Sequence, residues 1–151
     1  MTASASSSDR TAEVARSLLS SPELADSLVR SRGVIGQPIP VLRPDNQARQ
    51  AWFVPVTVAD LLAGFLVLGL DNVLRRWSSF QRRPDSIEGC PAAADWLSAP
   101  TILDRARTAG ADGKLGTPYL SYDCSPDRIA WIVPAGAQQV YVAGTTSWLG
   151  R

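Results

Sequence analysis

The sequence predicts an α+β fold of two tandem repeats, in each of which a helix packs on a three- to four-stranded antiparallel sheet. Three observations predict it: blocks of sequence recur at a nearly constant offset, each repeat begins with helix-start signals, and each helix is followed by segments that alternate apolar and polar residues. The chain has 151 residues, of which 45% are hydrophobic and 19% charged, as is typical of a globular protein with a packed core.

Three blocks of the first half match blocks of the second half in the same order, at offsets of 78 to 80 residues. The matched pairs are 19–26 with 97–104, 36–38 with 116–118, and 49–55 with 128–134. The last pair shares the motif Arg-x-Ala-Trp-x-Val-Pro, which places Trp52 and Trp131 at equivalent positions. One such block could arise by chance, but three collinear blocks indicate a duplication.

The expected organisation is a disordered polar lead over residues 1–10, a first repeat over 11–80, a linker over 81–90 and a second repeat over 91–151. A unit of about 70 residues buries little apolar surface and is marginally stable alone. The two units could therefore lie side by side or join their strands into one continuous sheet, and the sequence pattern leaves both alternatives open.

The main helix of the first repeat is expected to begin at Ser21, because serine favours the N-cap position. Pro22 then fits the first helical position, where its missing N–H costs nothing. Gly33 marks the expected end, because glycine favours the position that follows a helix. A short extra helical turn over 11–19 could join this helix through a kink at the proline.

Segments with strand periodicity follow this helix and are separated by turn residues. A tight turn is expected at Asp71 and Asn72, because both residue types tolerate the left-handed conformation that a short hairpin needs. The apolar stretch 53–70 is interpreted as a hairpin rather than a membrane span, since a proline, an aspartate and two glycines interrupt it. The expected extended segments are 38–43, 48–58, 63–69 and 73–80.

The second repeat predicts the same order of elements. Its main helix begins near Pro100 and ends at Gly110, and a shorter helical segment precedes it over 92–97. A turn is expected over 124–127. The expected strands are 119–122, 128–133, 139–143 and 145–149.

A helix followed by an Arg-x-Ala-Trp-x-Val-Pro strand and a hairpin is similar to PepSY-like domains, which are small α+β modules related in shape to cystatins. The closer match lies in the second repeat, over Ser125–Pro134 and then Val140–Gly144. The resemblance implies a non-catalytic role, in which the module binds, restrains or inhibits another protein, often a peptidase.

The composition excludes several kinds of chemistry. The chain has no histidine, which removes Ser-His-Asp and Cys-His nucleophile activation and histidine-ligated zinc. Its two cysteines, Cys90 and Cys124, cannot form a four-thiolate metal site, and we expect reduced, passive thiols, although pairing stays open. The glycine-rich segment 110–116 lacks the spacing of a phosphate loop and follows a helix. No catalytic, cofactor-binding or metal-binding residue is therefore predicted.

The residues expected to touch a partner are rich in arginine and aromatic side chains, the types that anchor protein interfaces. They are Arg75, Arg76, Trp77, Phe80, Arg82 and Arg83. On a strand, Arg75 and Trp77 would share one face, and Arg76 and Phe80 the other. An alternative interpretation is that Trp77 belongs to the core and that the arginines beside it are merely solvated.

These observations predict a non-enzymatic protein that binds another protein or a peptide, such as an inhibitor-like or immunity-like adaptor that uses a sheet face or hairpin edge. The alternative is a small-ligand-binding protein or enzyme with a cleft between the two repeats. A net charge of +1 argues against nucleic acid as a partner. The polar start of the chain lacks an export signal, so we expect a cytoplasmic location without membrane association.

Overall fold

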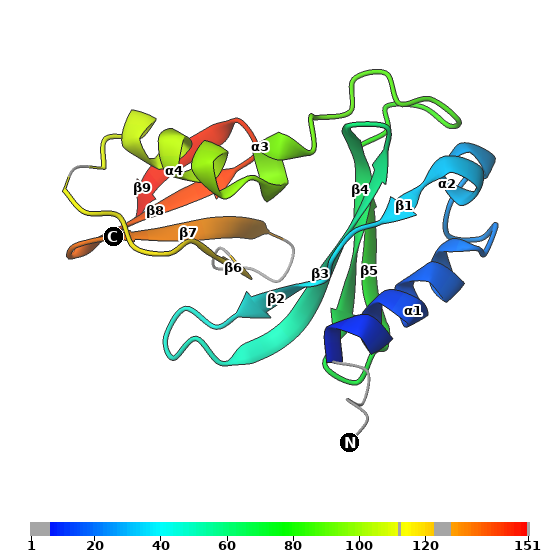
Figure 1. Ribbon diagram of the computed structural model, residues 1–151, viewed down its shortest axis with the longest axis horizontal. Coiled ribbons are helices and arrows are strands. Elements are labelled where there is room, and N and C mark those ends of the chain that lie inside the picture. The colour runs from blue at the N-terminus through cyan, green and yellow to red at the C-terminus, as the bar shows by residue number, and fades with distance from the viewer. Residues whose placement is uncertain (1–6, 112, 123–127, 151) are drawn as a thin grey trace. The chain divides into compact units, whose positions relative to one another are not determined.

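The computed structural model describes residues 7–111, 113–122 and 128–150 (Figure 1). The helices of this part of the chain are α1 (Ser7–Leu19), α2 (Ser27–Arg32), α3 (Ala94–Leu97) and α4 (Ala99–Thr108). Its strands are β1 (Val34–Ile35), β2 (Ile39–Leu42), β3 (Arg49–Val58), β4 (Leu61–Gly69), β5 (Leu74–Ser79), β6 (Tyr119–Tyr122), β7 (Ile129–Ala135), β8 (Gln138–Ala143) and β9 (Thr146–Gly150). The expected turn over 124–127 and residues 1–6 of the expected lead lie outside the described residues.

The nine described strands belong to one mixed sheet, in the order β5-β4-β3-β2-β6-β7-β8-β9, with β1 paired to β3. The predicted fold, two tandem repeats that each pack a helix on a three- to four-stranded antiparallel sheet of its own, is therefore wrong. Strands β2 and β6 join the two antiparallel parts by a parallel pairing, in which Val41 lies opposite Leu120. The physical reason is that each small sheet would leave an edge strand with unpaired backbone groups, and these groups are satisfied when two such edges pair.

The chain divides into two compact units, which we call the first unit (residues 1–40 and 50–92) and the second unit (residues 41–49 and 93–151). Helix α1 begins at Ser7, so the last residues of the expected polar lead are helical. The segment 81–90, expected as a linker, belongs to the first unit, where the side chain of Gln81 and the backbone N–H of Asp85 donate hydrogen bonds to Asp26.

The core of the first unit lies between α1, α2 and one face of β3, β4 and β5. Alternate residues of β3 point toward the helices, because successive side chains of a strand face opposite sides. Helix α1 contributes Ala15 and Leu19 to this core, and α2 contributes Val29. The buried sheet residues of the cluster are Trp52, Val54, Val56, Val58, Ala63, Leu66 and Leu68.

The hairpin interpretation of 53–70 is confirmed, because β3 and β4 pair antiparallel along this stretch. No helix within the described ranges is long and apolar enough to cross a membrane. The predicted tight turn after β4 is also present, with Asn72 in the left-handed conformation at φ 63°.

The predicted start of the main helix in the first repeat is wrong. Residues after Ser21 form turns, and α2 begins only after Asp26, whose carboxylate accepts a hydrogen bond from the Val29 N–H at 3.0 Å. Gly33 follows α2, but its φ of −68° is not left-handed. The stretch 11–19, expected as a short turn, lies in the 13-residue helix α1. Both serine and aspartate favour the N-cap position, and Asp26 also accepts hydrogen bonds from residues distant in the chain.

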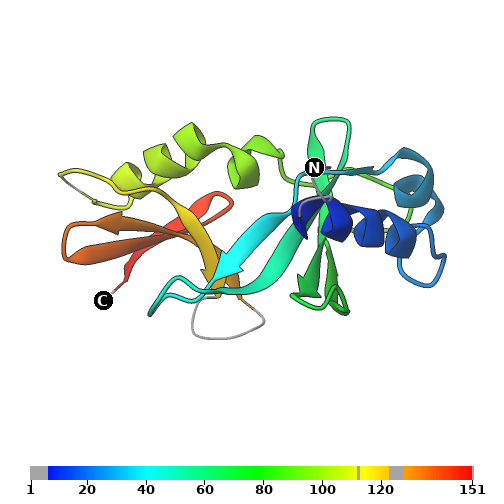
Figure 2. The same ribbon diagram turned by 60° about the horizontal axis from the view of Figure 1, so that its bottom comes forward.

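The second unit follows its predicted order more closely. Helix α4 has Ser98 as its N-cap, Pro100 in its first turn and Gly110 just after its end at φ 107°. It lies along one face of β7 and β8 (Figures 1 and 2), with Ile102 and Ala106 buried. Helix α3 remains separate from α4, because Ser98 between them is extended and caps α4.

One backbone contact recurs within each unit and explains a repeated sequence block. The N–H of Gly36 donates to the C=O of Pro55 at 2.9 Å, and the N–H of Gly116 donates to the C=O of Pro134 at 2.8 Å. A Cβ atom on Gly36 would lie 2.8 Å from the Pro55 ring. Glycine is therefore the residue that lets the chain pass this close to the proline.

The repeated tryptophans occupy the same strand position in their respective units. Trp52 on β3 is buried in the core beneath α1 and α2. Trp131 on β7 is half-buried against the core beneath α4, and its indole N–H donates to the C=O of Trp96 at 2.7 Å. Both indoles thus pack on the helix-covered face of the sheet.

Candidate functional site

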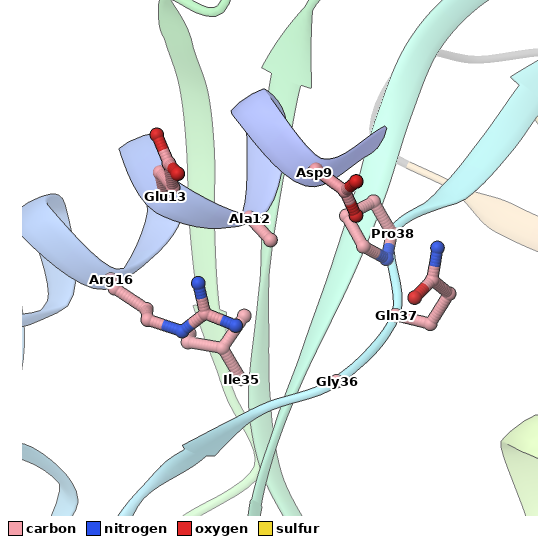
Figure 3. Close-up of a pocket in the computed structure, with 8 residues that line it drawn as sticks. All are labelled: Asp9, Ala12, Glu13, Arg16, Ile35, Gly36, Gln37 and Pro38. Atoms are coloured by element: carbon pink, nitrogen blue, oxygen red, sulfur yellow. The ribbon is translucent and has the colours of Figure 1, made fainter. Parts of the chain in front are cut away.

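A groove runs between α1 and the segment 34–38 of the first unit (Figure 3). It consists of two cavities, of about 390 and 340 Å³. Arg16 and Ile35 line both cavities, so the two are neighbouring parts of one open groove.

One stripe of α1 forms the first wall of the groove. Residues three and four positions apart lie on the same side of a helix, so the groove-lining side chains of α1, which have this spacing, share one helix face. A neighbouring stripe of the same helix, which includes Ala15, packs on the sheet and fixes the helix in place. The residues of α1 that line the groove are Asp9, Ala12, Glu13, Arg16 and Leu19, and Ser20 continues the wall beyond the helix.

Strand β1 and the residues after it form the second wall. Val34 lies opposite Thr57 of β3, and the next N–H that points to β3 belongs to Gly36. Because backbone groups alternate along a strand, the N–H and C=O of Ile35 point away from β3. Among the strands of the described residues, none pairs with this outer edge. Val34 is 60% exposed beside it.

The groove carries opposite charges toward its two ends. Figure 3 shows the Arg16 guanidinium reaching from α1 toward Ile35 and the Asp9 carboxylate beside Pro38, whereas Glu13 points away from the strand. Arg30 lines the end farther from Asp9, and its Nε–H donates to the C=O of Ala25 at 3.1 Å. This bond, made by Nε, holds the Arg30 side chain in place and does not involve its terminal N–H groups.

The partner-binding residues predicted from the sequence do not form one continuous surface. Trp77 lies opposite Leu66 and packs on the helix-covered face, as the alternative core interpretation expects, although it is only half-buried. Phe80 packs on Phe65, with ring centroids 5.9 Å apart. Arg76 is half-buried, and its Nε–H donates to Ser78 Oγ at 2.7 Å.

The remaining predicted arginines are exposed. Arg75 forms an ion pair with Asp71 at 3.2 Å, and Arg83 forms one with Glu88 at 2.8 Å. The structure brings three of the six predicted residues together, because Trp77, Arg82 and Arg83 line one pocket of about 320 Å³. No observation tests whether these residues touch a partner, so the binding role stays a prediction.

Sequence reasoning missed the groove. The spacing of Asp9, Glu13 and Arg16 fits one face of a helix, but residues 1–10 were expected to be disordered. A prediction that extended the first helix back to Asp9 would have placed these three charged side chains on one helix face. The two-residue strand β1 is too short to produce a sequence pattern, so the second wall had no usable signal.

The described residues offer no metal centre, since no group of three or more histidine, cysteine, aspartate or glutamate residues among them could hold an ion. Cys90 is buried, and this burial raises the pKa of its thiol. Cys124 lies outside the described residues, so its predicted state cannot be compared with Cys90.

Known proteins supply no ligand for the groove. No protein-family model, no curated protein and no solved structure matches this chain. The nature of the ligand therefore has to follow from the shape, the hydrogen-bonding groups and the charges of the groove itself.

Proposed function

We propose that the chain is a non-enzymatic protein- or peptide-binding module whose first unit holds an extended peptide segment in the groove between α1 and β1. The open outer edge of β1 carries this proposal. An extended segment can add to a strand edge by backbone hydrogen bonds, which here would involve the N–H and C=O of Ile35. Side chains of the segment would then alternate between the groove and solvent.

The length of the groove suits a short segment. Helix α1 has 13 residues. At about 1.5 Å per residue it is about 20 Å long. An extended chain rises about 3.3 Å per residue, so about six residues would span the helix. Apolar contact with such a segment is available from Leu19, Val34 and Ile35, which line the same cavity.

The charges of the groove favour one order of charges in the ligand. Asp9 would attract a basic side chain at one end, and Arg16 with Arg30 would attract an acidic side chain at the other. Exposed ion pairs contribute only about 0–1 kcal/mol each. We therefore expect these charges to set orientation and selectivity, while backbone pairing and apolar contact supply most of the affinity.

An inhibitor-like or immunity-like adaptor is the form of binding protein that we favour. The Arg-x-Ala-Trp-x-Val-Pro motif, which resembles PepSY-like modules, supports it, because such modules act by binding. A groove between a helix and a strand edge is also a natural place for a segment of a partner protein to enter.

The test is selection of a displayed library of random twelve-residue peptides on the immobilised full chain, followed by titration of the enriched peptides. We expect peptides with separated basic and acidic residues, and we expect their binding to shift the backbone amide NMR signals of Val34, Ile35 and Gly36. Arg16→Glu should weaken binding about tenfold, which corresponds to about 1.4 kcal/mol, because the charge reversal removes one attraction and adds a repulsion.

Arg10→Glu is the matched control. Arg10 lies exposed on the same helix but does not line the groove, and its substitution changes the net charge equally. Equal weakening by the two variants would show that only long-range charge matters. Failure to enrich any peptide, or shifts confined to residues outside the groove, would overturn the proposal.

A further inference from the structure

We infer that the pocket lined by Trp77, Arg82 and Arg83 is a second binding site of the first unit, which takes the C-terminal residue of a peptide when that residue is apolar. In this arrangement the apolar side chain lies against Trp77 and the free carboxylate pairs with the two arginines. The pocket has a volume of about 320 Å³ and lies between the residues that precede α2 and the segment that follows β5.

Part of the pocket lining is apolar. Leu24, Ala25, Trp77 and Pro84 all line it. The indole of Trp77 packs closely over Gly64, where an added Cβ would lie 2.6 Å from the indole atom Cη2. The backbone of β4 thus lies close to the indole at Cη2 and Cζ2, which restrains the ring that lines the pocket.

The indole also offers a hydrogen-bond donor. The N–H of Trp77 donates to no other described residue. Every buried side-chain nitrogen or oxygen of the described residues has a partner, so this N–H is open to solvent. A carboxylate or carbonyl oxygen of a ligand can therefore accept from it.

Arg82 and Arg83 both line the pocket. The Arg82 side chain lies directly over Gly89, whose φ is 86° and whose added Cβ would lie 2.5 Å from Arg82 Nε. Arg83 is held by Glu88, but both side chains are largely exposed, at 67% and 80%. Such an exposed pair is weak, so the carboxylate of a ligand can share or replace Glu88. Arginine binds carboxylates well because its N–H groups match both oxygens.

The pocket is also lined by the acidic residue Asp26, which does not cancel the preference of the two arginines for a carboxylate. Asp26 Oδ1 accepts from the Val29 N–H, and Asp26 Oδ2 accepts from Gln81 Nε2 at 3.0 Å and from the Asp85 N–H at 2.9 Å. The carboxylate is thus fully engaged with hydrogen-bond donors of the protein. Two arginines against one engaged carboxylate leave the lining with a net positive charge.

The same hydrogen bonds hold the two sides of the pocket together before a ligand arrives. Asp26 precedes α2 and accepts hydrogen bonds from the segment after β5. In return, Asp85 Oδ1 of that segment accepts from the Ser27 hydroxyl and the Leu28 N–H. A preformed pocket loses little entropy on binding. A C-terminal residue fits it best, because its side chain and carboxylate lie only two bonds apart and both can enter one small volume.

The first test uses N-acetyl-leucine, which has an apolar side chain and a free carboxylate, and N-acetyl-leucinamide, which lacks the carboxylate. The readout is the indole ¹⁵N–¹H NMR signal of Trp77, identified as the signal missing from Trp77→Phe. We expect a saturable shift with millimolar N-acetyl-leucine and a much weaker one with the amide. Equal shifts with both compounds would overturn the inference.

Variants then test the arginines. Arg82→Gln combined with Arg83→Gln should weaken N-acetyl-leucine binding at least about fivefold. The matched control is Arg10→Gln combined with Arg75→Gln, which removes the same charge from exposed positions of the first unit outside the pocket. The control should bind as the wild type does, and unchanged binding by the Arg82 and Arg83 variant would remove these residues from the site. Preserved backbone amide spectra show that each variant is folded.

Two peptides test whether the pocket takes a C-terminal carboxylate or the carboxylate of an internal acidic side chain. Acetyl-Ser-Gly-Ser-Leu with a free C-terminus should bind more tightly than acetyl-Ser-Glu-Leu-Ser-amide, which carries an internal acid beside leucine. The opposite order would assign the pocket to internal acidic motifs instead. Because the amide signals of Val34 and Ile35 report the groove separately, a failure here is distinguishable from a failure of the groove.

Discussion

Asp26→Ala is expected to destabilise the first unit because one carboxylate joins three parts of it. Its Oδ1 accepts from the Val29 N–H at 3.0 Å, which caps α2, and its Oδ2 accepts from Gln81 and Asp85. Loss of an N-cap costs about 1 kcal/mol. Loss of each further hydrogen bond costs about 0.5–1.5 kcal/mol. The sum is about 2–4 kcal/mol, and because Asp26 is partly exposed we expect a loss of about 2–3 kcal/mol.

The assay is urea unfolding followed by circular dichroism. With a urea dependence of about 2 kcal/mol per M, the midpoint should fall by about 1 M. Glu23→Ala is the matched control, because Glu23 is an exposed acid just before α2 and its side chain has no hydrogen-bond partner in the described part of the chain. The control should change the free energy of unfolding by less than about 0.5 kcal/mol. A similar small change for Asp26→Ala would refute the reasoning.

The effect should also depend on pH in a defined direction. Burial of Asp26 raises the pKa of its carboxyl, but hydrogen bonds from Asp85, Val29 and Gln81 outweigh this and hold the pKa below 3.8. A pKa lowered by folding means that the carboxylate stabilises the folded state above pH 3.8, and that this stabilisation is lost as the pH falls through the lower folded-state pKa. The difference between wild type and Asp26→Ala should therefore be smaller at acidic pH than at neutral pH. A difference that grows on acidification would contradict this assignment.

Two further substitutions test packing and sheet pairing. Gly64→Ala should lower the free energy of unfolding by about 1–3 kcal/mol, because its Cβ would meet the backbone oxygen of Ser78 and the indole of Trp77. Thermal unfolding measures this loss, and an unchanged melting temperature would contradict the close packing. Ser121→Ala should cost about 1–2 kcal/mol, because the buried Ser121 hydroxyl donates to the C=O of Leu42 at 2.6 Å beside the parallel pairing of β2 and β6. Chemical unfolding of the full chain checks it, and a loss below about 0.5 kcal/mol would argue against a role for this bond.

The sequence was most informative where structure depends on neighbouring residues. The turn at Asn72 followed from the tolerance of asparagine for the left-handed conformation, and the end of α4 followed from Gly110. The start of α2 was predicted wrongly because serine and aspartate both favour the N-cap position. Asp26 is the residue that also accepts hydrogen bonds from Gln81 and Asp85, which lie more than fifty residues away. A helix-start signal contains no information about such distant donors.

The pairing of β2 with β6 and the two candidate sites also depend on contacts between residues that are distant in the sequence. Val41 and Leu120 are paired across 79 positions of the chain, and nothing in the local alternation of β2 indicates a parallel partner. The sequence pattern already divided the predicted partner-binding residues of β5 between two strand faces. It did not indicate the bulge between Leu74 and Arg76 in the pairing with β4, or the packing of Phe80 on Phe65. Strand periodicity assigns faces, but it does not say which face a helix will cover.

The difference between the two units explains why we place both binding sites in the first. Helix α3 precedes α4 as α1 precedes α2, but α3 has only four residues, whereas α1 has 13. At about 1.5 Å per residue, α3 is about 6 Å long and cannot wall a groove for an extended segment. The part of the second unit that corresponds to β1 is a single bridge between Leu115 and Ala135. A longer first helix and the added strand β1 therefore form the groove for which we propose peptide binding. Shortening α1 should remove this groove while the contact of Gly36 with Pro55 remains.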